Sequence, residues 1–174
     1  MKKSILVPGL ALVLLVSGCS GQGAAAQKFS CDEISFSISV PDFVSYKVHN
    51  LDLSQTGLAI YDKSISLAVS GEDGRPVNMT VQYNENSDGN TMIEKGKMLA
   101  ELTPDTFSIE EFEIDGLDSY IFRFSGQDSV HCDYMLDDNS WVVVSYLSDD
   151  GGLAKYQDAL VDSLKSFKRT DNAG

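Results

Sequence analysis

Residues 34 to 41, Ile-Ser-Phe-Ser-Ile-Ser-Val-Pro, indicate the class of fold that this chain adopts. Every second residue from Ile34 to Val40 is apolar, and the residues between them are serines. This alternation predicts a β-strand that has one face on a core and the other toward solvent. Pro41 lacks the backbone N–H that a sheet needs, so the strand ends there.

The same two-residue period recurs along the chain. It is clear from Val77 to Tyr83 and from Tyr120 to Phe124. Phe107 to Ile114 is a further predicted strand, and Asp115-Gly116 after it is a dipeptide typical of tight hairpins. The run from Trp141 to Leu147 is apolar on both faces at its start, which predicts a central strand covered on both sides.

Two segments have the period of a helix instead. Thr91 to Glu94 fits a capping box and predicts a helix that continues to about Leu102, before Pro104. From about Gly152 to Ser166, apolar residues recur every three or four positions, a stripe that packs on a sheet. Several strands, a helix, four strands and a second helix predict an antiparallel α+β sandwich.

Four of these segments together resemble the PsbP/Mog1-like fold of many small bacterial lipoproteins. They are the strand that ends in Pro41, the mid-chain helix, the Glu-Ile-Asp-Gly hairpin at 113 to 116, and the closing YQDALVDSLKSFK of Tyr156 to Lys168. The resemblance implies a curved antiparallel sheet of about six to eight strands with two helices packed on its faces. Relatives with this fold are mostly accessory or binding proteins without a shared catalytic residue, so no site residue is carried over.

The amino-terminal segment predicts export. Lys2 and Lys3 precede an apolar run from Ile5 to Val16. That run is shorter than the about 20 residues that cross a bilayer core, and it has the length of a signal-peptide core. Leu-Val-Ser-Gly-Cys at 15 to 19 looks like a bacterial lipobox. This resemblance implies a diacylglyceryl group on the sulfur of Cys19 and cleavage after Gly18. An ordinary secretory signal with a chance cysteine is the alternative.

These signals divide the chain into four parts. We expect a lipoprotein signal peptide at residues 1–18, lipidated Cys19 and a flexible tether at 19–27, a single α+β domain at 28–169, and a disordered tail at 170–174. Two or more acyl chains hold a protein stably at a bilayer. The expected location is therefore the extracytoplasmic face of the cell membrane, through a covalent lipid at Cys19.

Charge and composition argue against several classes of function for this chain. The chain has 13 Lys and Arg against 26 Asp and Glu, a net charge of −13. So acidic a chain is a poor partner for nucleic acid, because phosphate contacts need clustered cations. Two His and three Cys leave little for a metal or nucleophile site, and no G-x-S-x-G elbow occurs. We expect no catalytic residue, metal or cofactor. A hydrolase that uses paired carboxylates is the remaining enzyme hypothesis, without residues to name.

Cys31 and Cys132 are a candidate disulfide, because bridges persist in exported domains. Strand parity places Cys132 inward with Tyr134, whereas Cys31 precedes its strand with the opposite parity. Two separate thiols, with Cys132 in the core, are the alternative.

The sequence thus favours a membrane-anchored surface lipoprotein that acts as a non-enzymatic accessory or interaction module, with a protein partner of unknown identity. A small-ligand or cation-binding lipoprotein is the alternative.

Overall fold

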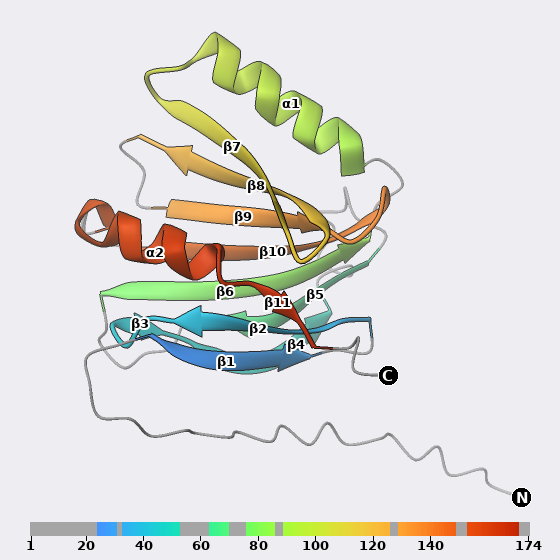
Figure 1. The fold of residues 1–174 in the computed structure, drawn as a ribbon, viewed down its shortest axis with the longest axis vertical. Coiled ribbons are helices and arrows are strands. Elements are labelled where there is room, and N and C mark those ends of the chain that lie inside the picture. Colours follow the sequence, from blue (N-terminus) through green and yellow to red (C-terminus); the bar gives the residue numbers. More distant parts are fainter. Residues whose placement is uncertain are drawn as a thin grey trace, which may run out of the picture.

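The computed structural model describes residues 24–30, 33–52, 63–69, 76–85, 89–125, 129–148 and 153–170. These residues form a large and a small β-sheet, two α-helices and one turn of 3-10 helix (Figure 1). The large sheet runs in spatial order through β4 (Lys47–Asp52), β5 (Lys63–Val69), β6 (Val77–Glu85), β10 (Ser140–Leu147), β9 (Ser129–Met135), β8 (Leu117–Phe124) and β7 (Phe107–Ile114). Neighbours on this path are antiparallel, and β3 (Val44–Ser45) joins β6 in parallel.

The small sheet covers part of one face of the large sheet. It consists of β1 (Ala25–Ser30), β2 (Ser35–Val40) and β11 (Lys168–Arg169), with β2 in the middle. Phe36, Ile38 and Val40 of β2 are buried in one core with Val81 and Val144 of the large sheet. The serines between them are half-buried, so the alternation of residues 34 to 40 is realised as predicted.

Helix α2 (Gln157–Leu164) covers the same face beside the small sheet, after the 3-10 turn η2 (Leu153–Tyr156). Leu160 and Leu164 are fully buried in the core between the sheets. The hydroxyl of Tyr134 on β9 donates a hydrogen bond of 2.7 Å to the carbonyl of Leu164. A carbonyl in the last turn of a helix has no partner within the helix, so this bond satisfies it inside the core.

A series of stacked rings joins the two sheets. The ring centroids of Phe29 on β1 and Phe36 on β2 are 5.4 Å apart. Phe36 stacks on Phe167 at 4.8 Å, and Phe167 stacks on Tyr134 of β9 at 4.1 Å. Because Phe167 lies between α2 and β11, the end of the chain fills the space between the sheets.

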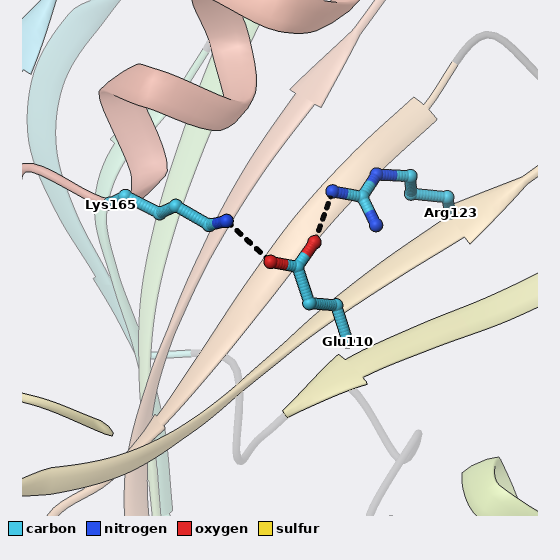
Figure 2. A network of polar contacts seen from close by, with 3 residues as sticks. All are labelled: Glu110, Arg123 and Lys165. Atoms are coloured by element: carbon cyan, nitrogen blue, oxygen red, sulfur yellow. Dashed lines mark hydrogen bonds and ion pairs between the residues drawn. The ribbon is translucent and has the colours of Figure 1, made fainter. Parts of the chain in front are cut away.

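A charged cluster fixes the end of α2 to β7 and β8 (Figure 2). The carboxylate of Glu110 on β7 accepts a 2.5 Å hydrogen bond from the guanidinium of Arg123 on β8, and another from the ammonium of Lys165 after α2. These two hydrogen bonds lower the pKa of Glu110 below its ordinary value, and the bond from Lys165 has the larger effect.

Helix α1 (Gly89–Leu102) covers the opposite face of the large sheet. Neighbouring residues of a strand point to opposite faces. On β8, Ile121 belongs to the core under the small sheet, and Phe122 belongs to a second cluster with Ile93 of α1. The α1 backbone lies so close to Phe122 that a Cβ atom built on Gly96 would be 2.7 Å from the ring atom Cε1. Glycine at this position therefore permits the close packing of α1 on the sheet.

The α+β class is confirmed, with eight strands in the large sheet and helices on both faces. The predicted hairpin is also present: β7 ends at Ile114, and Asp115 and Gly116 have φ values of 53° and 76°. Positive φ at both central residues is the geometry of a type I′ turn.

Four details differ from the sequence predictions. The opening strand belongs to the small sheet, because a two-residue period shows which face is buried but not which strand is the partner. β1 begins at Ala25, inside the expected tether, where Ala25 to Gln27 show no apolar alternation. α1 begins at Gly89, so Thr91 lies within the helix and is not its cap. β10 is central but covered on both faces only near its start, since Leu147 is exposed.

We predict that Gly96→Ala destabilises the protein although alanine favours helices. Crowding in a packed core costs about 1 to 3 kcal/mol, which outweighs the about 1 kcal/mol that alanine contributes in a helix. In a Phe122→Leu background the added methyl group has space, and Gly96→Ala should become stabilising. Urea unfolding of the four variants measures both effects. Equal stabilisation in the two backgrounds would contradict the contact between Gly96 and Phe122.

Candidate interaction surface

The structure describes one of the three cysteines singled out by the sequence. Cys132 lies on β9 as a free, fully buried cysteine, and its burial raises the pKa of the thiol. Its side chain faces the core between the sheets together with Tyr134, as strand parity predicted. Cys19 and Cys31 lie outside the described residues, so lipidation and the candidate disulfide remain predictions.

Exposed apolar side chains gather on α1. Met98, Leu99 and Leu102 are 55%, 41% and 70% exposed. Residues three and four positions apart are neighbours on a helix surface, so these three form one patch on the last turns of α1. We call Met98, Leu99 and Leu102 the α1 stripe. In the described part of the chain, the other large apolar side chain with comparable exposure is Leu147 on β10, which is 40% exposed.

The opposite side of α1 is firmly packed. Ile93 is buried in a cluster with Phe107, Tyr120 and Phe122, and the ring atoms of Phe122 contact the helix at Gly96. The ammonium of Lys97 lies 2.8 Å from the carboxylate of Glu111 on β7, which raises the pKa of Lys97. The same ammonium lies 5.1 Å from the ring centre of Tyr120. These contacts hold the helix in one position, so the α1 stripe is presented on a rigid support.

The flank of the α1 stripe is mainly acidic. Glu94, Glu101 and Asp105 are exposed, and Lys95 is the exposed lysine of the helix on this side. Glu94, Met98 and Glu101 follow one another at spacings of four and three residues, whereas Asp105 lies beyond the end of α1 at Leu102. This spacing continues along one side of a helix, so Met98 lies between two carboxylates. The surface therefore combines an apolar centre with net negative charge.

A polar pair, the half-buried His131 and the buried Asp133, lies on the same face of the sheet. His131 and Asp133 on β9 point to the α1 side, because Cys132 between them and Val130 before them point to the other core. The His131 ring stacks on Phe122, with centroids 4.6 Å apart. Its Nε2 atom lies 3.8 Å from Oδ1 of Asp133, and this oxygen accepts no hydrogen bond within the described part of the chain. Sequence reasoning gave neither residue a role. His131, Asp133 and Met135 alternate along one strand and so share a face. This alternation was the signal that could have placed both residues on the side of the sheet opposite to Cys132.

Burial changes the protonation of this pair. It raises the pKa of Asp133 to about 7 and lowers the pKa of His131 to about 4. Between these values the folded pair holds one proton. The unfolded pair, with ordinary pKa values of 3.8 and 6.5, also holds one proton over most of this range. The two shifts therefore oppose each other, and the pair alone gives folding little pH dependence in this range.

A second candidate site is a cleft of about 620 Å³ where α2 meets the end of β2. Its walls are formed by Ala24, Ser39, Pro41, Asp42, Phe43, Ala159, Asp162, Ser163 and Ser166. The serines are already used in the fold. Ser166 Oγ accepts a hydrogen bond from the Ser39 amide at 2.7 Å, and Ser163 Oγ donates to the Ser39 carbonyl. These bonds leave the Ser163 and Ser166 hydroxyls less available to a ligand, so the cleft is the weaker candidate.

No known protein family matches the chain, and no curated protein matches its sequence. Among solved structures, it is similar to the solution structure of cyanobacterial PsbP (CyanoP) from Synechocystis sp. PCC 6803. The identity is 13%, the match covers 89% of this chain and 99% of that chain, and the TM-score is 0.49. A Pseudomonas aeruginosa protein of unknown function, PA94, is 10% identical over 81% of this chain and 94% of that one, with a TM-score of 0.32.

A PsbP structure is thus among the structural neighbours. Both TM-scores are below 0.5, so neither likeness carries an argument about this chain. Within the described ranges, no helix has the length and apolar character to cross a membrane. Over the same ranges, no three His, Cys, Asp or Glu side chains are grouped closely enough to hold a metal ion.

We predict that replacing either His131 or Asp133 makes the free energy of unfolding depend on pH through the residue that remains. In Asp133→Asn, His131 remains with a lowered pKa. The free energy of unfolding, relative to the unaltered protein, should therefore rise from about pH 4 to pH 6.5, by about 3 kcal/mol at most. In His131→Gln, Asp133 remains with a raised pKa, and stability should fall between about pH 4 and pH 7, by about 4 kcal/mol at most.

Urea unfolding at a series of pH values measures both slopes. The neighbouring Lys97 and Tyr120 have raised pKa values, above 10.5 and 10.0, so neither titrates in this range. Parallel pH profiles for the two variants would show that His131 and Asp133 are not buried as described.

Proposed function

We propose that this protein is a lipid-anchored extracytoplasmic interaction module without enzymatic activity. The observation that carries the proposal is the α1 stripe, an exposed apolar surface on an otherwise well-packed helix. Exposed apolar side chains gathered into a patch indicate a contact surface for another molecule. The neighbouring carboxylates of Glu110 and Glu111 on β7 are engaged in ion pairs, Glu110 with Arg123 and Lys165 and Glu111 with Lys97.

The position of α1 in the fold fits an anchored protein. The longest axis of the molecule is vertical in Figure 1, with α1 at the top and β1 at the bottom. β1 begins at Ala25, and Cys19 precedes it by only six positions. A chain segment of this length spans at most about 21 Å. A lipid on Cys19 would therefore hold the β1 end near the membrane and present α1 at the opposite end.

The alternative is a small-ligand or cation-binding lipoprotein, for which the cleft beside α2 is the candidate site. Asp42 and Asp162 among its lining residues suit a cationic ligand. The internal hydrogen bonds of its serines weigh against it, and we place it second.

Cys19→Ser tests the anchor, because serine has no thiol to receive a diacylglyceryl group. In a bacterial host that processes lipoproteins, we expect the unaltered protein in the membrane fraction and Cys19→Ser outside it. Intact mass spectrometry should show the lipid adduct only on the unaltered protein. Cys132→Ser is the matched control and should remain in the membrane fraction. Recovery of the unaltered protein in the cytosol with its leader intact would overturn the proposed location.

A further inference from the structure

The size of the α1 stripe limits what can bind to it. Stable complexes between two folded proteins bury about 800 Å² on each partner. Met98, Leu99 and Leu102, which are only partly exposed, cover less than this. A surface of one helix with anchors three and four residues apart is, however, suited to a second amphipathic helix. The stripe thus fits a short helical segment better than a broad protein surface.

The charge of the flank selects the partner further. Glu94 and Glu101 lie on either side of Met98 along the helix. Lys97 forms an ion pair with Glu111. Among the described residues of α1, Lys95 is therefore the lysine near the stripe that is not in an ion pair. A partner with Lys or Arg beside its apolar residues would meet these carboxylates favourably. Charge complementarity of this kind speeds association and excludes partners of the same sign.

Two other occupants fit less well. A second copy of the chain would bring the same acidic flank, so like charges would meet. A membrane surface carries anionic headgroups, which repel an acidic flank. In addition, α1 lies at the end of the molecule opposite to β1, where the expected anchor is attached (Figure 1).

We propose that the α1 stripe is the docking site for an amphipathic helix of a partner protein whose apolar side chains are flanked by Lys and Arg. This inference rests on the interaction role proposed above, but it does not depend on the lipid anchor.

Site-specific crosslinking tests the docking site directly. A photoreactive benzoylphenylalanine replaces Leu99 in the full-length protein, held in phosphatidylcholine nanodiscs. The probes are a designed amphipathic helix of leucine and lysine, the same helix with glutamate for lysine, and a scrambled leucine–lysine peptide. The matched control carries the photoreactive residue at Asp158, an exposed position of α2. We expect strong crosslinking of the leucine–lysine helix at position 99 and little with any other combination.

Surface substitutions separate the contribution of the apolar side chains to binding from that of the acidic side chains. Leu102→Gln removes an apolar contact without changing the charge. A fully buried leucine is worth about 1.5 to 3 kcal/mol, so crosslinking at position 99 should require at least about tenfold more peptide. Glu94→Lys with Glu101→Lys should weaken binding of the lysine peptide and allow binding of the glutamate peptide. Leu147→Gln, at an exposed apolar position of β10, is the control and should leave binding unchanged.

Four outcomes would overturn the inference: equal crosslinking of the lysine and glutamate peptides, equal crosslinking at position 158, adducts with lipid, or adducts between two copies of the chain. Cys19→Ser distinguishes these outcomes from failure of the anchor. A protein that is not lipidated should still capture the leucine–lysine helix if the docking site is correct.

Discussion

The stacked rings of Phe29, Phe36, Phe167 and Tyr134 are the contact on which the arrangement of the two sheets depends. Aromatic pairs in such geometries contribute about 0.5 to 1.5 kcal/mol beyond the area that they bury. Here the series joins β1 and β2, near the beginning of the domain, to β9 and to the segment after α2, which are distant from them in sequence. It therefore sets the distance between the sheets and the position of α2 together.

The two faces of the large sheet are used differently. The small sheet and α2 bury one face in a continuous core, whereas α1 covers part of the other with a smaller cluster. Because α1 is packed along only one side, its other side is available for contacts. The dense core on one face supplies a rigid support, and the thinner cover on the opposite face supplies the surface that we connect with function.

Much of the fold was predictable because a two-residue period shows directly which side of a strand is buried. The hairpin of β7 and β8 follows from the Phe107 to Ile114 pattern and the Asp115-Gly116 turn. The division into two sheets was not predictable, since serine-alternating strands such as β2 fit either sheet. The contact of Gly96 with Phe122 and the burial of Asp133 depend on where α1 comes to lie, which no local pattern specifies. The α1 stripe was missed for the same reason, because Met98 and Leu99 could equally have formed the packed side.

The place of β11 in the small sheet has a consequence for the order of folding. β2 pairs on one edge with β1 and on the other with Lys168 and Arg169, and the Ser163 and Ser166 hydroxyls extend that pairing to Ser39. The strand near the beginning of the domain thus acquires its second neighbour only from residues near the end. During synthesis, this edge of β2 stays unpaired until almost the whole polypeptide has been made. Such late closure of long-range pairs slows folding and leaves an open strand edge meanwhile, so a chain truncated before Phe167 would lack a completed core.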